Sequence, residues 1–498
     1  MTLWQPPSCE STRPISAKRN VYGAVLVVDG GNGGREQWSG AVLSTIQAFF
    51  EPDRRSVNPA ARLQATIELM HEVDSIARPA DAVVSAWFRA RRYIGDRDRG
   101  QILDLLHALL RHHARLGWWL ARHGREDRPR NRLLAWLTLT EGGTPDQVKR
   151  LFNGAKFAPA MLTDHEHALL VKLQGCAIDH PSMPEEVRLE CPSWAADPLR
   201  RRFKEAFGQE MAALLTPAPL DLRVNPIKST REAMLGALKD LGLQAQASAL
   251  APYGIRVHER PSLASLPMLK NGEVEIQDEG SQLVAMLVDA RPGERVVDFC
   301  AGAGGKTLAI AAQMNNKGHV VACDVMEGRL KRGAERFRQA GLHNIETRLL
   351  ASETDRWIKR HKGGFDRVLV DAPCSGTGTW RRNPDARWRA QEEQGLDRLV
   401  SLQARILASA ARLVKPGGRL VYATCSLMLE ENEEQVAAFL AAYPAFRAVP
   451  LSEAAPQLTN SSHPDYLSLT PARNDTDGFF AAIMQREGAL PGGATDSH

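Results

Sequence analysis

The sequence predicts a multidomain chain: a C-terminal α/β domain with a parallel, doubly wound sheet, preceded by a small α+β module and an all-α domain. Three observations predict this. Apolar residues recur at helical spacing between about residues 59 and 150, strand and helix signals mix between 216 and 280, and short apolar strands alternate with helices from 281 onward. The length of 498 residues also fits about three domains at roughly 150 residues each.

The composition is that of an ordinary globular protein. The hydrophobic fraction is 43% and the charged fraction 24%, which excludes global disorder, collagen-like repetition and a coiled-coil rod. Lys and Arg number 63 against 58 Asp and Glu, and the net charge of +5 permits nucleic acid as a partner without requiring it. The seven cysteines contain no C-x-x-C pair, so we expect reduced thiols and a cytoplasmic location. The apolar run at residues 21–28 is too short to span a bilayer, so neither a membrane nor secretion is expected.

The N-terminal part divides into an extension and a helical domain. Residues 1–58 show no sustained period and predict a disordered or non-native extension. Leu63, Ile67, Met70 and Val73 then open a helical pattern that continues to about residue 150. Its polar faces carry arginines. Each single arginine could simply be solvated on a helix face or could contact a phosphate, but as a set they fit contacts with RNA phosphates better. These are Arg89, Arg91, Arg92, Arg97, Arg99, Arg111, Arg115, Arg125, Arg128, Arg130 and Arg132.

The remaining boundaries follow from changes in pattern. Residues 151–215 predict a helical linker broken by prolines, and residues 216–280 a small α+β module with strands at 220–224 and 255–258. Between them a helix is predicted over 230–241, with Thr230 as its N-cap and Gly242 as its stop. Residues 281–486 predict the α/β domain and residues 487–498 a tail. The parallel strands of this domain are expected at 295–297, 320–322, 367–370 and 420–423.

A glycine-rich loop follows the first of these strands. The segment Asp298-Phe299-Cys300-Ala301-Gly302-Ala303-Gly304-Gly305-Lys306-Thr307 opens a helix at 308–313, where close backbone approach and the helix N-terminus favour a nucleotide-like ligand. It is not a P-loop, because position 301 is Ala where that motif needs its first Gly. Asp324 ends the next strand and could accept hydrogen bonds from both hydroxyls of a ribose. From the residues alone, Asp324 fits NAD, S-adenosylmethionine or a plain cap of the helix at 326–340.

Two cysteines lie just beyond the carboxyl ends of two other predicted strands. One lies in Val370-Asp371-Ala372-Pro373-Cys374-Ser375-Gly376, the other in Tyr422-Ala423-Thr424-Cys425-Ser426. Ligands and chemistry gather at this edge of an open α/β sheet. A lone cysteine in such a place is usually a small buried hydrophobe, but two of them indicate a shared site.

These motifs resemble those of the Sun-type RNA (cytosine-5) methyltransferases, and most closely of the bacterial members that act on small-subunit ribosomal RNA. The resemblance covers about residues 220–486. The helical segment 59–150 is similar to the NusB-like RNA-binding domain of the same family. Further matching blocks are Leu222-Arg223-Val224-Asn225-Pro226, Gln277-Asp278-Glu279-Gly280-Ser281, Glu431-Asn432-Glu433 and Asp477-Gly478-Phe479-Phe480. The chain departs from the family in the glycine loop, which usually reads C-A-A-P-G-G-K-T.

The resemblance implies a class I methyltransferase domain with a Rossmann-like fold, and it implies roles for the site residues. Cys425 would attack carbon 6 of cytosine, Cys374 would assist release of the product, Asp371 would bind the cytosine edge, and Lys306 would steady the base. S-adenosylmethionine is the implied cofactor, and no metal is expected. Its implied contacts are Cys300, Ala301, Gly302, Ala303, Gly304, Gly305, Lys306, Asp324 and Asp371. For the adenine, Ser352 and Glu353 are candidates only.

The implied partner is RNA, 16S ribosomal RNA first and tRNA as the alternative, bound by a monomer. The segment Trp380-Arg381-Arg382-Asn383-Pro384 offers an aromatic face and cations for looped RNA, although Trp380 could equally pack under its loop. Two other functional classes are weighed. A catalytically silent RNA-binding assembly factor would be expected to have lost Cys425 or the glycine loop. A dinucleotide-dependent oxidoreductase would give no reason for the two cysteine motifs.

Overall fold

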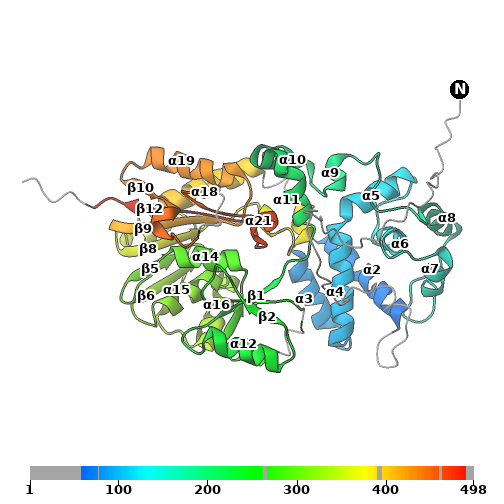
Figure 1. Ribbon diagram of the computed structural model, residues 1–498, viewed down its shortest axis with the longest axis horizontal. Coiled ribbons are helices and arrows are strands. Elements are labelled where there is room, and N and C mark those ends of the chain that lie inside the picture. Colours follow the sequence, from blue (N-terminus) through cyan, green and yellow to red (C-terminus); the bar gives the residue numbers. More distant parts are fainter. Residues whose placement is uncertain are drawn as a thin grey trace, which may run out of the picture. The chain divides into compact units, whose positions relative to one another are not determined.

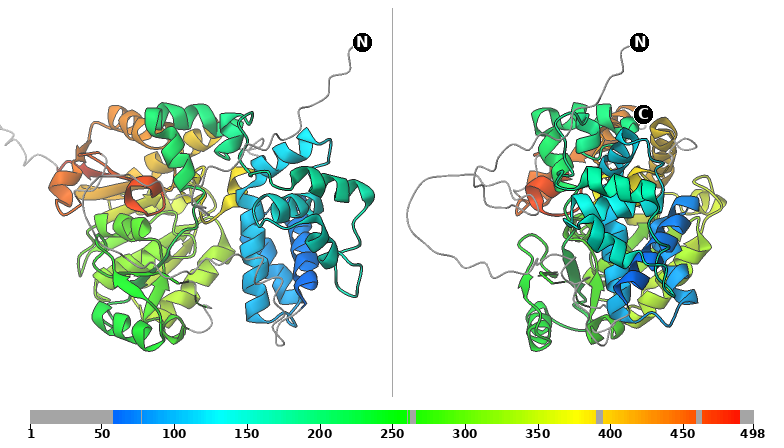
Figure 2. Two further views of the ribbon diagram at one scale, coloured as in Figure 1. Left: turned by 45° about the vertical axis from the view of Figure 1, so that its right-hand side comes forward. Right: turned by 90° about the vertical axis from the view of Figure 1, so that its right-hand side faces the viewer.

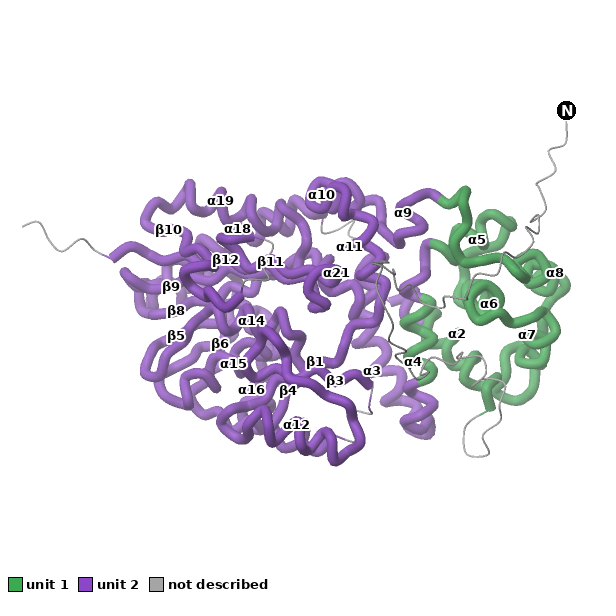
Figure 3. Tube along the Cα trace, in the orientation of Figure 1, with its two compact units in different colours: residues 1–71, 101–109, 115–183 green, residues 72–100, 110–114, 184–498 purple. Residues whose placement is uncertain are grey.

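The computed structural model describes residues 58–76, 78–259, 261, 266–389, 395–458 and 463–488. The extension predicted for residues 1–58 and the tail predicted from 487 lie almost wholly outside these residues. The chain forms two compact units, coloured separately in Figure 3: residues 1–71, 101–109 and 115–183 in the first, and residues 72–100, 110–114 and 184–498 in the second. The domain boundaries given above stay a prediction.

The first unit is helical in all its described residues. It contains α6 (Pro129–Leu139), α7 (Pro145–Leu151) and α8 (Asp164–Leu173), and it shares α2 (Pro59–Ser75), α4 (Asp96–Arg111) and α5 (His113–Arg122) with the second unit. In Figure 2 the described chain shows only helices in the blue to teal residues that precede β1. Helix α6 is buried along nearly its whole length, which makes it the centre of this bundle.

Several arginines of the helical segment serve internal contacts. Arg115 is 7% exposed and pairs with Asp179 at 2.8 Å, while Arg132 is 5% exposed and pairs with Asp127 at 2.5 Å. Because these guanidinium groups are buried, the prediction of phosphate contacts is wrong for both. It stays a prediction for the exposed Arg89 on α3 (Ala80–Ala90) and for Arg92 after it.

A small α+β module opens the sheet-containing part of the second unit (Figure 1). Its antiparallel sheet has the order β2-β3-β1-β4. The strands are β1 (Leu220–Val224), β2 (Ala245–Ala247), β3 (Gly254–Val257) and β4 (Val274–Ile276), with helices α12 (Arg231–Asp240) and α13 (Pro267–Lys270). The N-cap prediction is confirmed, because the Thr230 side chain accepts a hydrogen bond from the Ala233 amide.

The large sheet is mixed, with the order β10-β12-β9-β8-β5-β6-β7 and β11 paired to β12. Its parallel strands are β5 (Arg295–Asp298), β6 (His319–Asp324), β7 (Ile345–Leu349), β8 (Phe365–Asp371) and β9 (Val414–Thr424); β10 (Phe446–Val449), β11 (Leu467–Leu469) and β12 (Phe479–Arg486) pair antiparallel. The four parallel strands predicted from the sequence are thus confirmed, and β7 joins them.

Both faces of this sheet are buried, which explains why its strands read as continuous apolar runs. On one face Val296, Val320 and Leu369 pack with α14 (Glu279–Leu287), α15 (Gly305–Gln313) and α16 (Glu327–Ala340). The alternate residues Val297 and Val321 pack on the other face with α17 (Arg356–Arg360), α18 (Leu396–Ala411) and α19 (Glu433–Ala442). This is the three-layer architecture that the alternation of strands and helices predicts.

Helices from the segment predicted as a linker also belong to the second unit. Beside the short α9 (Glu185–Arg188), α10 (Ser193–Phe203) and α11 (Phe207–Ala213) contribute Leu199 and Met211 to a buried cluster that includes Trp380 and Leu427. Trp380 lies just after the first cysteine turn, so these helices support the loops of the site. None of the described helices is both long and apolar enough to cross a membrane.

Candidate active site

One candidate cavity lies at the carboxyl ends of the parallel strands. From β5 the chain passes to β6 and β7 on one side and to β8 and β9 on the other, so strand order reverses between β5 and β8. This switch point is where open α/β sheets bind ligands. The cavity measures about 1260 Å³. Its walls include the glycine loop, Asp324, Asp371 and both motif cysteines, and thus bring together residues that the sequence spreads over more than a hundred positions.

The glycine loop connects β5 to the N-terminus of α15. Gly304 caps that helix with φ 81°, and a Cβ there would lie 2.3 Å from the Phe337 ring. Gly302 also has a positive φ of 58°, but a Cβ there would meet nothing within 4 Å. The loop is therefore shaped by two left-handed residues, as glycine allows. Of the cofactor contacts predicted in this loop, residues 300–303 line the cavity and residues 304–306 do not. Their role in binding the cofactor stays a prediction.

Asp324 ends β6 with both carboxylate oxygens engaged. One oxygen accepts the Gly302 amide at 2.8 Å and the other the Met326 amide at 2.7 Å. The side chain thus shapes the glycine loop and also caps the turn into α16, which was the alternative reading of this residue. It is 7% exposed and lines the cavity, so a carboxylate still borders the space where a ribose would lie.

Lys306 and Asp371 form an ion pair at the floor of the site. Lys306 Nζ lies 2.8 Å from Asp371 Oδ2, and the lysine side chain is 9% exposed against 30% for the aspartate. Burial by itself would lower the pKa of Lys306, but the charge and hydrogen bond of Asp371 raise it above its usual value, with a further contribution from Cys425. Lys306 is therefore charged, and its ammonium group is bound to the Asp371 carboxylate.

The two motif cysteines come together at the ends of neighbouring strands. Strands β8 and β9 pair in parallel with Asp371 opposite Ala423, and the turns that follow place Cys374 Sγ 3.4 Å from Cys425 Sγ. Both thiols are half-buried and line the cavity. The hydrogen bond with Cys425, then burial, then the charges of Cys425 and Glu431 raise the pKa of Cys374 well above its usual value.

Helix α18 supplies a wall of the cavity that the sequence did not indicate. Leu402, Arg405 and Ile406 line it, and no motif marks them, because their role depends on where α18 packs. Ser352 and Glu353, the candidates for the adenine contact, also line the cavity, and Glu353 pairs with Arg405 at 2.8 Å. The cation of this pair, Arg405, therefore lies at the end of the cavity that Ser352 and Glu353 line.

Of the two readings of Trp380, packing under its loop is the one that the structure shows, and for Arg381 the predicted RNA contact is wrong. Trp380 is 0% exposed and Arg381 1% exposed. Arg381 pairs with Asp477 at 2.9 Å, and the half-buried Arg382 pairs with Asp278 at 2.8 Å. These groups anchor the loop instead of presenting a face to RNA. Asp278 and Asp477 belong to two of the matching blocks, which gives those blocks a structural role.

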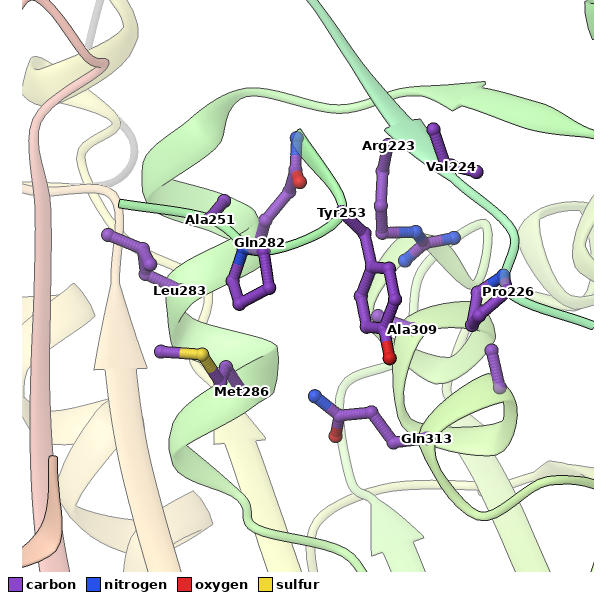
Figure 4. A pocket seen from close by; sticks show the side chains of 12 residues that line it. Arg223, Val224, Pro226, Ala251, Tyr253, Gln282, Leu283, Met286, Ala309 and Gln313 are labelled. Carbon is purple, nitrogen blue, oxygen red and sulfur yellow. The ribbon is translucent and has the colours of Figure 1, made fainter. Parts of the chain in front are cut away.

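A second cavity, of about 220 Å³, lies between α14, α15 and loops of the small module. Figure 4 shows the Arg223, Gln282 and Gln313 side chains around Tyr253. The Nη1 group of the buried Arg223 donates to the Gly305 carbonyl at 2.9 Å and to Gln277 Oε1 at 2.8 Å. Arg223 thus holds the start of α15, but this cavity contains neither cysteine and no carboxylate. Within the described residues, no group of three or more His, Cys, Asp or Glu could hold a metal ion.

Comparison with known proteins agrees with this geometry. A family model described as 16S rRNA methyltransferase RsmB/F matches residues 285–485, and one described as the ferredoxin-like domain of RsmF/B-like methyltransferases matches residues 191–264. A probable ribosomal RNA small subunit methyltransferase B of Synechocystis is 36% identical over 298 residues, covering 59% of this chain and 66% of that protein. The corresponding Bacillus subtilis protein is 34% identical over 320 residues, covering 63% of this chain and 70% of that protein.

A solved structure shares the fold of the second unit's sheet. It is a methyltransferase homolog protein from Pyrococcus horikoshii, with 30% identity and a TM-score of 0.53, covering 62% of this chain and 100% of that one. The matched part of our chain spans about two thirds of the length of the curated relatives. Neither family model covers the helical segment 59–150, because their matches begin at residue 191. The similarity of this segment to a NusB-like domain therefore stays a prediction. On the family models and the relatives together, the chain belongs to the RsmB/F family of 16S rRNA methyltransferases.

Proposed function

We propose that the protein is an S-adenosylmethionine-dependent RNA methyltransferase that forms 5-methylcytosine in 16S ribosomal RNA through a covalent cysteine adduct. The observation that carries the proposal is the pair of thiols 3.4 Å apart beside the Lys306–Asp371 ion pair, in one cavity with the glycine loop. An oxidoreductase has no use for such a pair in this place, whereas cytosine methylation needs a nucleophile and a second group that handles a proton.

The residues present fit S-adenosylmethionine. The cavity volume of about 1260 Å³ leaves room for both a nucleoside cofactor and a base. Residues 300–303 would lie along the cofactor, Asp324 would accept from its ribose, and Ser352 or Glu353 would lie beside its adenine. When bound, S-adenosylmethionine supplies the electrophilic methyl group on its sulfonium sulfur.

Cys425 would be the nucleophile. Carbon 5 of cytosine attacks an electrophile poorly, and addition of a thiolate to carbon 6 makes it an enamine-like carbon. The Cys425 sulfur would form the bond to carbon 6 while the ring takes up a proton, or hydrogen bonds, at nitrogen 3. Lys306 supports this step because its ammonium group interacts with Cys425, and a nearby cation favours the thiolate form of a cysteine.

Asp371 and Cys374 would serve the steps before and after methylation. Asp371 would bind the edge of the base at nitrogen 3 or 4, held in place by its bond to Lys306. After carbon 5 has gained the methyl group, its hydrogen must leave as a proton and the bond between Cys425 and carbon 6 must break. Cys374 lies 3.4 Å from Cys425 and would assist this release by hydrogen-bonding the departing Cys425 thiolate, while the proton from carbon 5 would pass to water.

The RNA part of the proposal rests on the relatives and on general constraints. A base must leave its stack to enter such a cavity, at a cost of a few kcal/mol. The curated relatives are named for small-subunit ribosomal RNA, and the helical segment 59–150 would contribute RNA affinity as a NusB-like domain. A tRNA is the alternative substrate. We place the enzyme in the cytoplasm, acting as a monomer.

The test compares two single cysteine variants with labelled RNA and S-adenosylmethionine. Cys425→Ala should transfer no methyl group and form no adduct, because addition is lost. Cys374→Ala should add and methylate but release slowly, and should accumulate a protein–RNA adduct that survives denaturing electrophoresis. Cys176→Ala, a thiol of the first unit, is the matched control and should behave as wild type.

The opposite pattern would make Cys374 the nucleophile, as in enzymes that use the Pro-Cys cysteine for attack. Absence of methyl transfer by the wild type to 16S ribosomal RNA and to tRNA alike would overturn the enzymatic proposal. It would favour the silent assembly factor instead. Bisulfite sequencing of RNA from a deletion strain would then identify the modified cytosine where transfer does occur.

A further inference from the structure

The two motif thiols touch each other on the wall of an open cavity. Both side chains are half-buried and line the cavity of about 1260 Å³. Cys374 Sγ lies 3.4 Å from Cys425 Sγ, and a disulfide bond is about 2.05 Å long, so the sulfurs have to approach by only about 1.4 Å to bond. A small oxidant that enters the cavity therefore meets both thiols at once.

The backbones that carry the two cysteines run side by side. Strands β8 and β9 are hydrogen-bonded neighbours, and just beyond β8 the Ala372 amide donates to the Ala423 carbonyl at 2.8 Å. Neighbouring strands lie about 4.7–4.9 Å apart, within the range of about 4.4–6.8 Å that separates the Cα atoms of a disulfide. Beyond the sheet the chains stay together, because the Gly378 amide donates to the Cys425 carbonyl at 2.9 Å. The spacing of the two chains therefore suits a disulfide without a change in the strands.

Buried side chains fix the turns on which the thiols lie. The hydroxyl groups of Ser375 and Ser426, which follow the two cysteines, lie 3.1 Å apart, and both donate to Oε2 of Glu431. The Leu427 amide donates to the Thr377 hydroxyl at 2.8 Å. All five of these side chains are buried, and none of these hydrogen bonds involves a sulfur atom. The turns are therefore held in the same way whether the two thiols are reduced or bonded to each other.

Oxidation of such a pair by a hydroperoxide takes two steps. One thiolate attacks a peroxide oxygen, the O–O bond breaks, hydroxide leaves, and the sulfur becomes a sulfenic acid. The second thiolate attacks that sulfur, the S–O bond breaks, and a second hydroxide leaves as the disulfide forms. Each hydroxide takes up the proton that a thiol has released. Hydrogen peroxide is thus reduced to two waters while the two thiols together lose two electrons.

We propose that Cys374 and Cys425 form a reversible disulfide when a hydroperoxide reaches the cavity, and that this disulfide switches the site off and protects its thiols from irreversible oxidation. Either thiol can be attacked first, because the product is the same. A sulfenic acid without an adjacent thiol is oxidised further to sulfinic and sulfonic acids, which thiol reductants do not reverse. In the disulfide neither sulfur is free to add to a base. The loss of methylation rests on the proposed function, whereas disulfide formation does not.

A third thiol lies near enough to be a competitor. Cys300 also lines the cavity, but its side chain packs against the apolar cluster on the α18 face of the sheet. We therefore expect the bond to join Cys374 to Cys425 and to leave Cys300 reduced.

The experiment follows the thiols directly. The folded full-length protein is freed of reductant and treated with an equimolar amount of hydrogen peroxide at neutral pH. The remaining thiols are blocked with N-ethylmaleimide, and peptide mass spectrometry without reduction identifies the bonded cysteines. A disulfide between Cys374 and Cys425 should be the main oxidation product, and dithiothreitol should restore both thiols. Methyl transfer to RNA should fall in proportion to the disulfide formed and should return with dithiothreitol. Cys176→Ala, which removes a thiol of the first unit, is the matched control and should form the same disulfide to the same extent.

Cys374→Ser tests the protective role, because it removes the second thiol. In this variant Cys425 should progress to sulfinic acid, which dithiothreitol does not reverse. A wild type that gives sulfinic acid in place of the disulfide, or a disulfide that joins either cysteine to Cys300, would overturn the proposal. A disulfide that leaves methyl transfer unchanged would overturn it as well. Failure of the proposed function would appear differently, as a disulfide that forms and is reversed in a protein that methylates no RNA.

Discussion

Replacing Gly304 by alanine should weaken the fold at the cofactor loop in two separable ways. The residue has φ 81°, and an alanine in the left-handed region costs about 1–2 kcal/mol. Its Cβ would also lie 2.3 and 2.5 Å from Cε1 and Cζ of Phe337. That ring is 5% exposed and packed in the core, so it must shift, and such overpacking typically costs about 1–3 kcal/mol. The expected loss of unfolding free energy is the sum, about 2–5 kcal/mol.

Gly302→Ala provides the matched control in the same loop. Its φ is 58° but its new Cβ would meet nothing within 4 Å, so only the backbone cost of about 1–2 kcal/mol applies. Equilibrium urea unfolding without ligand should rank the proteins as wild type, then Gly302→Ala, then Gly304→Ala. Phe337→Leu should recover part of the loss in the Gly304→Ala background, a coupling that a double-mutant cycle measures. Equal losses for the two glycine variants would refute the role assigned to the Phe337 contact.

Two further predictions concern pH and RNA. Burial raises the pKa of Asp298 to about 7. The folded state therefore binds more protons than the unfolded state between about pH 4 and 7. Because of this difference, the contribution of Asp298 to stability falls as the pH rises through that window. Asp298→Asn should remove this dependence and be more stable than wild type at pH 8 in urea titrations; parallel pH curves for the two proteins would contradict it. Replacing both exposed arginines Arg89 and Arg92 by Gln should weaken RNA binding and reduce the slope of log affinity against log salt by roughly 1.5–2. The affinity for S-adenosylmethionine should not change, Lys359→Gln is the control, and an unaltered slope would remove these arginines from the RNA surface.

The parts of the fold that could be predicted are those that local pattern determines. The strands predicted at 295–297 and 320–322 contain valines that are buried on both faces of the sheet, and the structure extends them by one residue and by three, to Arg295–Asp298 and His319–Asp324. The fourth predicted strand, at 420–423, belongs to a longer strand that begins at Val414. Its first residues contain Pro416 and two glycines, which read as a turn in the sequence, and pairing with β8 resumes after an irregularity near Phe365.

The site was predictable where a motif follows a strand, and not where tertiary packing decides. Asp324, Asp371, Cys374 and Cys425 all follow parallel strands, so the rule that ligands bind at that edge places them together. The α18 residues carry no such signal. Glu431 belongs to a matching block, but the sequence does not show its contacts with Ser375 and Gln403, which lie 56 and 28 positions away. The two open readings of Trp380 have the same origin: an aromatic residue beside arginines fits an RNA contact as well as packing under the loop, and only the packed cluster with Leu199 and Leu427 shows that it is buried.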